Sequence, residues 1–208
     1  LLRAGLEAPI SAFYDPGQRP LFRDPAGFDV ERLRGRLRQA VHVRLLNALR
    51  YARPVFRFLK GLRSDATASL VDELRHRGCL PDGPDVEVHS AGAGRTAEVV
   101  RDIVIRWISE GYCKPESILV LSPHSQQQKT GLAGADHVGA WPLASHENRA
   151  PGQVSLLSVN KAKGLDSLGV ILIDLRPFDD LADDQERMDY FMGASRARQL
   201  LAVVHRED

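Results

Sequence analysis

Ile118-Leu119-Val120-Leu121 and Val170-Ile171-Leu172-Ile173-Asp174 are two short apolar runs in a chain of 208 residues. A strand with one solvated face alternates apolar and polar residues, whereas a strand in a parallel sheet covered on both faces is apolar throughout. Each run has the length of a buried strand and is short for a buried helix. The two runs therefore predict a mainly parallel sheet with helices on both of its faces.

Strand and helix patterns alternate around these two runs. Amphipathic patterns predict helices at 96–109 and 185–198, and further short apolar runs predict strands at 86–88, 154–159 and 200–204. Such alternation is typical of an α/β domain with a mainly parallel sheet. Residues 126–151 are rich in Gly, His and polar residues and show no pattern that assigns them to a helix or a strand.

The first 84 residues are mostly helical by their pattern. They predict helices at 29–41, 53–62 and 67–76, with Pro54 in the first turn of the second of these. Short strands are expected at 10–14 and 43–46. The alternation of strands and helices that indicates an α/β domain begins only after this part of the chain.

Composition excludes several classes of protein. No apolar run approaches the length of a membrane-spanning helix. The two cysteines, Cys79 and Cys113, form no CxxC motif, and HExxH is absent, so we expect no metal site. Two free thiols favour a reducing compartment and hence a cytoplasmic protein. The chain begins at Leu1 rather than Met, so we expect a piece of a longer protein.

The net charge of +1 predicts no partner, but the charges are unevenly distributed. Residues 32–63 contain ten Lys or Arg residues and no Asp or Glu, whereas residues 179–189 are strongly acidic. A stretch of one sign attracts polyanions such as a phosphate backbone. The alternative is a solvated helix face without a partner, and charge alone favours that alternative.

A glycine-containing turn, Gly92-Ala93-Gly94-Arg95-Thr96, precedes the helix expected at 96–109. A phosphate-binding P-loop has the pattern GxxxxGK[ST], in which the backbone wraps the phosphates and the lysine reaches their outer oxygens. Here His89 occupies the first glycine position and Arg95 the lysine position. We therefore interpret the segment as a turn that caps the helix through Thr96, with phosphate binding as the less favoured alternative.

Two segments near the C-terminus are more specific. Residues 158–166 are Ser-Val-Asn-Lys-Ala-Lys-Gly-Leu-Asp, and residues 190–198 are Tyr-Phe-Met-Gly-Ala-Ser-Arg-Ala-Arg. Together they resemble motif V (TxHxxKGLE) and motif VI (YVAxTRA) of the UvrD/Rep-like superfamily 1 DNA helicases. The likeness is carried by residues 163–166 in motif V and by residues 193–197 in motif VI.

Three upstream segments are similar to further motifs of this family, in the family's order. Residues 14–18 resemble motif III (GDxxQ), residues 45–50 resemble the LxxNxR segment, and residues 118–127 resemble the strand with a trailing Gln that opens the second motor domain. The resemblance implies three parts. Residues 1–28 would be a remnant of the first motor domain with motif III. Residues 29–84 would be a helical connecting region, and residues 85–208 the RecA-like second motor domain with motifs IV to VI.

The resemblance assigns nucleotide-contacting roles to five residues. Arg196 and Arg50 would reach the γ-phosphate of ATP bound on the first motor domain, and Gln18 would sense that phosphate or the attacking water. Asp166, where the family usually has Glu, would hold the ribose hydroxyl, and Gly164 would allow close approach of the backbone. An arginine supplied by a facing domain stabilises the charge that gathers on the transferred phosphoryl group.

The resemblance also implies contacts with single-stranded DNA. Ser158, Asn160 and Lys163 lie where the family touches the DNA backbone, with Asn160 in place of the family's His. The expected partners are therefore single-stranded DNA and the N-terminal ATP-binding motor domain, and no membrane is expected. Leu49 replaces the family's adenine-stacking Tyr.

Several parts of the family's machinery are missing from the sequence. It contains no Walker A and no DExx motif, so ATP and Mg²⁺ would bind to the first motor domain of a longer protein. We expect no cofactor on this chain alone, which would then be inactive as an enzyme. About thirty residues separate Gln127 from Ser158, too few for the 2B subdomain that the family inserts there. The resemblance is thus to a compact motor.

Two other functions remain open. One is a degenerate RecA-like domain that binds nucleic acid or a partner without ATP turnover, which Leu49 and Asn160 favour. The other is an independent phosphate-binding enzyme that uses residues 92–96.

Overall fold

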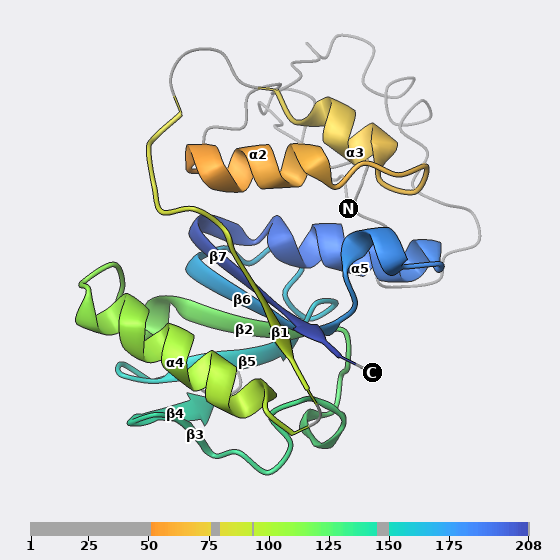
Figure 1. The fold of residues 1–208 in the computed structure, drawn as a ribbon. Coiled ribbons are helices and arrows are strands. Elements are labelled where there is room, and N and C mark those ends of the chain that lie inside the picture. Colours follow the sequence, from red (N-terminus) through yellow and green to blue (C-terminus); the bar gives the residue numbers. More distant parts are fainter. Residues whose placement is uncertain (1–50, 76–79, 93, 145–149, 208) are drawn as a thin grey trace, which may run out of the picture. The chain divides into compact units, whose positions relative to one another are not determined.

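A computed structural model describes residues 51–75, 80–92, 94–144 and 150–207 of the chain (Figure 1). These residues belong to one compact unit, in which a sheet lies between two layers of helices. The helix expected at 29–41 and the strands expected at 10–14 and 43–46 lie outside the described residues.

The described strands form one seven-stranded sheet in the order β1-β7-β6-β2-β5-β4-β3. Their bounds are β1 Glu87–Ala91, β2 Ile118–Ser122, β3 His137–Val138, β4 Trp141–Ala144, β5 Val154–Ser158, β6 Ser167–Leu175 and β7 Ala197–Arg206. Neighbouring strands are parallel except for the antiparallel pair β3 and β4. The expected α/β fold with a mainly parallel sheet is confirmed, and it is consistent with a RecA-like domain.

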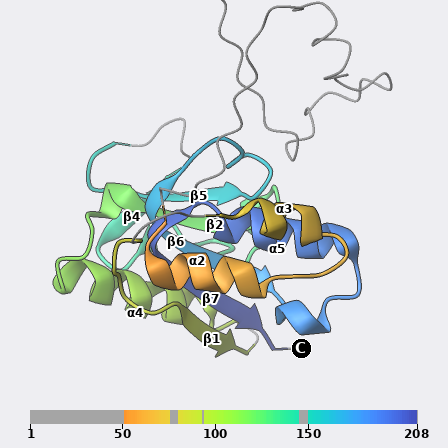
Figure 2. The same cartoon turned by 90° about the horizontal axis from the view of Figure 1, so that it is seen from above.

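Successive side chains of the central strands point into two separate cores, as the alternation of a strand requires. On one face Leu119 and Leu172 pack with α2 (Arg53–Gly61), α3 (Ala68–Glu73) and α5 (Asp184–Ala194). On the other face Val120 and Ile171 pack against α4 (Thr96–Ser109). Figure 1 shows α5 and α4 on opposite sides of the sheet, and Figure 2 shows α2, α3 and α5 together over one face.

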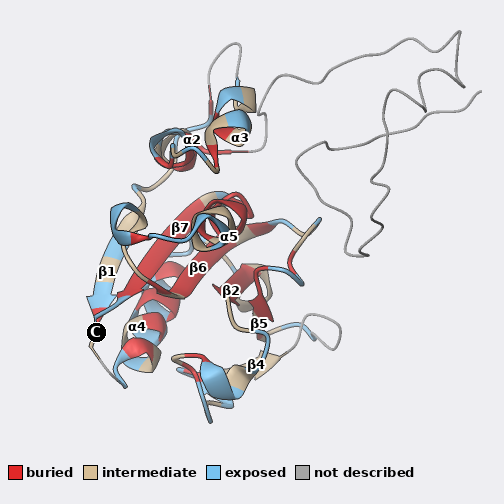
Figure 3. Cartoon of the chain, turned by 90° about the vertical axis from the view of Figure 1, so that its right-hand side faces the viewer, coloured by how far each residue is buried: buried red, intermediate tan, exposed pale blue. Residues whose placement is uncertain are grey.

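The adjacent strands β6 and β7 are buried on both faces, whereas β1, next to β7, is an exposed edge of the sheet (Figure 3). This explains why β6 and β7 are visible in the sequence as continuous apolar runs. It also explains why β1, with the mixed sequence Glu-Val-His-Ser-Ala, gives a weaker signal.

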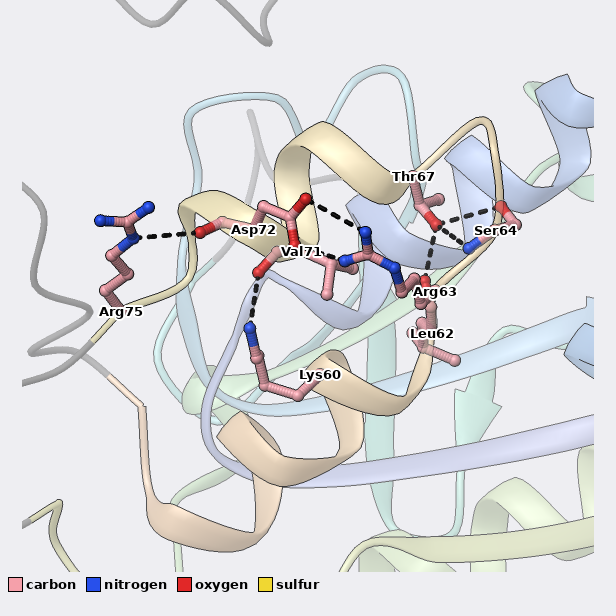
Figure 4. A network of polar contacts seen from close by, with 8 residues as sticks. All are labelled: Lys60, Leu62, Arg63, Ser64, Thr67, Val71, Asp72 and Arg75. Carbon is pink, nitrogen blue, oxygen red and sulfur yellow. Dashed lines mark hydrogen bonds and ion pairs between the residues drawn. The ribbon is translucent and has the colours of Figure 1, made fainter.

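α2 and α3 are connected by a short turn held by polar contacts (Figure 4). The buried Thr67 hydroxyl donates to the Leu62 carbonyl at 2.6 Å and accepts from the Ser64 amide at 2.9 Å. Arg63 forms an ion pair with both carboxylate oxygens of Asp72. Both of these side chains are exposed, so solvent screens the pair and it stabilises the turn only weakly. The buried Thr67 hydroxyl is the stronger constraint on the turn.

The expected helices at 53–62 and 96–109 are confirmed as α2 and α4. Two other helices end earlier than predicted. The helix expected at 67–76 is α3, which ends at Glu73 because Leu74 adopts an extended conformation. The helix expected at 185–198 is α5, which ends at Ala194 because Ala197 already pairs with Ser167 in the sheet.

The expected capping role of Thr96 is wrong. Arg95 is the N-cap residue of α4, and it makes no side-chain capping bond. Thr96 is the first helical residue, and its side chain is packed closely against Gly131, where an added Cβ would lie 2.6 Å from the Cβ of Thr96. Packing against a neighbouring loop thus fixes Thr96.

The three-part division at residues 28 and 84 stays a prediction. Residues 1–28 lie outside the described residues, and the described helices α2 and α3 share one hydrophobic core with the sheet. Within the described ranges, no helix combines the length and the apolar content needed to cross a membrane.

Candidate functional site

The turn between α5 and β7 carries Arg196. Only Ser195 and Arg196 separate the end of the helix from the start of the strand. The Arg196 side chain is 5% exposed, and its guanidinium group donates to the carbonyl of Met192 at 3.1 Å, to the Ser195 hydroxyl at 3.0 Å and to the carbonyl of Leu165 at 3.4 Å. Arg196 is therefore held within its own domain by oxygens from two segments, the end of α5 and the loop before β6.

Residues 159–166 form the second segment, the loop between β5 and β6. Gly164 has a φ of +82°, a conformation that favours glycine. The backbone conformation therefore explains why this position of the motif is a glycine. Asn160 and Asp166 are exposed and Lys163 is partly exposed. The loop thus presents polar groups to solvent, as a binding loop must.

The structure brings the start of β6 and the start of β7 together at the amino edge of the sheet. Ser167 donates its backbone N–H to the Arg196 carbonyl at 3.0 Å, and Arg196 contacts Leu165, the neighbour of Asp166. Three of the five expected nucleotide-contacting residues, namely Gly164, Asp166 and Arg196, therefore belong to two adjoining segments. Arg50 and Gln18 lie outside the described residues.

The backbone just after Arg50 is fixed beside the same turn. Tyr51 is buried, and its hydroxyl donates to the Ser195 carbonyl at 3.3 Å. The Ala52 amide donates to the Arg198 carbonyl at 2.7 Å. The chain therefore enters the described unit next to Arg196. Sequence reasoning did not single out Tyr51, although its position next to an expected arginine was the available signal.

Lys163 lies close to α5. Burial raises the pKa of the Asp189 carboxyl, and a hydrogen bond from Gln185 together with the charge of Lys163 offsets part of that shift. The charge of Lys163 thus acts on Asp189 of α5.

Ser158 occupies the opposite, carboxyl edge of the sheet, as the last residue of β5. Its hydroxyl is buried and accepts from the Lys161 amide at 3.3 Å, which begins the loop as a turn. Ser158 lines a pocket of about 190 Å³. The pocket also includes polar residues that follow β2 and a second residue of the loop, namely His124, Ser125, Gln127 and Lys161.

His124 and Lys161 were not predicted as site residues. Lys161 lies inside the segment that resembles motif V, and the order of parallel strands could have indicated His124, because residues that follow β2 and β5 meet at one edge. Among the described residues, no group of three or more His, Cys, Asp or Glu side chains could hold a metal ion. Cys113 is a free, half-buried thiol, and burial raises its pKa to about 11.

The described part of the chain is a RecA-like α/β domain whose functional candidates are divided between the two edges of a parallel sheet. No family model matches the chain, and no curated protein matches it.

Among solved structures, the chain is similar to the C-terminal domain of a possible DNA helicase from Lactobacillus plantarum WCFS1. The TM-score is 0.50 at 20% sequence identity, and the match covers 76% of this chain and 87% of that one. At this identity the likeness shows a shared fold. The fold of this chain is thus one that also occurs as the C-terminal domain of a possible helicase.

Proposed function

We propose that this chain is the second motor domain of an ATP-dependent superfamily 1 DNA helicase or translocase of the UvrD/Rep-like type, in a compact form. The observation that carries the proposal is the contact between the turn with Arg196 and the loop with Gly164 and Asp166. Residues more than thirty positions apart in the sequence, from two separate motifs, meet at one edge of the sheet. The shared fold with the C-terminal domain of a possible DNA helicase supports the same proposal.

In this proposal ATP and Mg²⁺ are held by a first motor domain, and this chain supplies cations to the phosphates. Arg196 and Arg50 would lie opposite the γ-phosphate, with Gln18 beside the attacking water and Asp166 at the ribose. Positive charge from a facing domain stabilises the oxygens of the phosphoryl group in the transition state. Gly164 leaves room for the nucleotide, since nothing in the described structure lies within 4 Å of a Cβ built there.

Arg196 has to change its hydrogen-bond partners in order to act on a phosphate. Its guanidinium group donates to Met192, Ser195 and Leu165 within its own domain. Closure of the two motor domains would exchange neutral acceptors for phosphate oxygens, which form stronger, charge-assisted hydrogen bonds. The buried position of Arg196 would then keep the side chain close to its working orientation between cycles.

The carboxyl edge would face single-stranded DNA. Ser158 and Lys161 line a pocket there, and Asn160 lies between them in the chain. Lys163 lies further along the loop, before the Leu165 carbonyl that contacts Arg196. Polar and cationic groups along such an edge suit contacts with a phosphate backbone, which do not depend on base sequence. Such a motor would act in the cytoplasm.

A second candidate is a degenerate RecA-like domain that binds nucleic acid or a partner without ATP turnover. One observation favours it. Arg196 is 5% exposed and bound to three oxygens of its own domain, as a purely structural arginine would be.

The test is the ATPase activity of the full-length protein with and without single-stranded DNA, for the wild type, Arg196→Ala and Arg198→Ala. Arg198 is the matched control, because it is an exposed arginine two positions further along the chain, in β7. We expect DNA-stimulated turnover that falls by about 10³-fold in Arg196→Ala, as for an arginine finger, and is unchanged in Arg198→Ala. No turnover in the wild type, or equal turnover in all three proteins, would leave the degenerate domain as the better account.

A further inference from the structure

A second pocket, of about 180 Å³, lies where α4 begins and where β1, β6 and β7 end. It is thus at the carboxyl edge of the parallel sheet, where α/β proteins bind ligands. The residues that matter for its chemistry are Gly92, Gly94, Thr96, Lys129, Asp174 and Arg206.

Thr96 is the unexplained residue of this pocket. Its side chain is 8% exposed and lines the pocket, yet its hydroxyl forms no hydrogen bond with any residue in the described part of the chain. The Thr96 hydroxyl is not among the buried polar atoms that lack a partner in the described part of the chain, so its oxygen is open to the pocket. It is therefore available to a group bound in the pocket.

The electrostatics of the pocket favour an anion. α4 has 14 residues, and in its first turn the Glu98 amide donates to the Arg95 carbonyl at 3.1 Å, whereas the amides of Thr96 and Ala97 have no acceptor in the described structure. The end of the helix at these two amides is a place for negative charge.

Lys129 and Arg206 reach the pocket from two other segments, and both are exposed cations. Gly94 has a φ of +80°, and nothing lies within 4 Å of a Cβ built there, so the backbone before the helix is open to the pocket at this residue. At Gly92 the nearest atom to such a Cβ is a carboxylate oxygen of Glu207, at 3.8 Å.

Asp174 is the one acidic residue of the pocket among the described residues, and its oxygens are engaged. One carboxylate oxygen accepts from the Ser122 hydroxyl at 2.7 Å and the other from the Gly131 amide at 2.8 Å. The backbone of Asp174 has a φ of +64°, which is rare for a residue other than glycine, and these two bonds hold it there. The carboxylate thus organises the loop at Gly131, which in turn packs on Thr96.

We propose that this pocket binds a phosphate group, held by the first amides of α4, the Thr96 hydroxyl and the cations of Lys129 and Arg206. Anion binding at a helix N-terminus by amides and a neighbouring hydroxyl is a general arrangement. The site is no ATP-hydrolysing P-loop, because Arg95 at the lysine position is paired with Glu98 along the helix at 3.3 Å. The proposal does not rest on the motor function proposed above.

The phosphate could belong to a nucleic-acid backbone or to a small phosphate ester. The two pockets share His124 and Thr130, so a nucleic-acid strand at the pocket of Ser158 would continue into this one. A free phosphate ester needs no such continuity. Both sources present the same phosphate oxygens to the site.

The test is a titration of the ¹⁵N-labelled 208-residue chain with inorganic phosphate, followed in amide NMR spectra at constant ionic strength with chloride as the reference. We expect saturable shifts at the amides of Thr96, Ala97 and Gly131. Thr96→Val, which keeps the side-chain shape, should weaken phosphate binding about tenfold, as expected for one hydrogen bond to a charged group. Lys129→Gln, at an exposed position, should also weaken it, and the control Lys114→Gln should not.

The source is then separated by the binding of a labelled single-stranded oligonucleotide, measured by fluorescence anisotropy. Weaker oligonucleotide binding by Thr96→Val would assign the site to a nucleic-acid backbone. Unchanged oligonucleotide binding, together with weakened binding of inorganic phosphate, would assign it to a small phosphate ester. Shifts no larger than those in chloride, or equal phosphate binding by Thr96→Val, Lys129→Gln and Lys114→Gln, would overturn the proposal.

Discussion

Replacing Tyr190 by phenylalanine removes one hydroxyl from the buried contact between α5 and β7. The Tyr190 hydroxyl lies 3.0 Å from Nε2 of His205, and both side chains are buried. The ring contacts with Phe178 at 5.5 Å and with Phe58 at 6.4 Å do not involve the hydroxyl and remain. The cost is therefore that of one buried hydrogen bond plus an unsatisfied ring nitrogen, about 1–3 kcal/mol of the free energy of unfolding.

The assay is urea and thermal unfolding of the wild type and Tyr190→Phe at pH 8, where His205 is neutral. For a domain of this size the predicted loss corresponds to a fall in Tm of roughly 2–12 °C. Tyr112→Phe is the matched control, because Tyr112 is 44% exposed and its hydroxyl has no hydrogen bond within the described ranges. It should change stability by about 0.5 kcal/mol or less. Equal stability of Tyr190→Phe and the wild type would refute the reasoning, since the hydroxyl and His205 would then not be paired in solution.

Two further predictions concern packing and titration. Burial lowers the pKa of His205, so the unfolded chain binds more protons between that pKa and the ordinary value of about 6.5. The contribution of His205 to the free energy of unfolding is then fully present above about pH 6.5, and it is lost as the pH falls towards the pKa of the folded state. In His205→Gln, the urea midpoints measured between pH 8 and pH 5 should lack this pH-dependent decrease. Gly169→Ala should destabilise the domain by about 1–3 kcal/mol, because the added Cβ would lie 2.9 Å from the buried ring of Trp107. Displacement of that ring should also change the near-ultraviolet circular dichroism spectrum. The control Gly61→Ala meets no atom within 4 Å and should stay within about 1 kcal/mol of the wild type.

The fold was predictable from the sequence where burial is uniform. β2 and β6 are covered on both faces, so each contains a continuous apolar run in the sequence. α4 has one apolar stripe, and the length of that stripe predicts where the helix begins and ends. The β3–β4 pair was missed because β4 is a short, half-buried strand that contains Pro142. β6 begins three residues before its apolar run, because the polar Ser167 is buried by donating to the Ser117 carbonyl at 2.6 Å. Such a tertiary contact leaves no trace in local periodicity.

The residues of the candidate site could be predicted from the sequence, but their contacts and burial could not. The resemblance named Arg196 and Asp166, and the parallel order of β6 and β7 accounts for their neighbouring segments at one edge. The burial of Arg196 could not be predicted, because it depends on acceptors from Leu165 and Met192. Thr96 was assigned to a cap because sequence spacing does not reveal the approach of Gly131 from another loop.

The loop of residues 159–166 is a single covalent link between opposite edges of the sheet. Leu157, Leu121 and Leu172 lie in one row across β5, β2 and β6, so Ser167 is five residues closer to the amino edge than that row. Because β5 ends at Ser158, one residue beyond that row, the loop must return about 20 Å along the strands while it crosses two strand spacings of about 5 Å each.

The sheet itself resists relative movement of its two edges, because β5, β2 and β6 are joined by ladder hydrogen bonds and would have to move together. The loop is the softer path. Two backbone hydrogen bonds hold it in shape, from Ala162 to Ser158 at 3.1 Å and from Leu165 to Ala162 at 3.0 Å. A displacement of Ser158 would therefore reach Asp166 through this loop, and the two hydrogen bonds together with the buried side chains of Val159 and Ala162 would limit how far the loop extends.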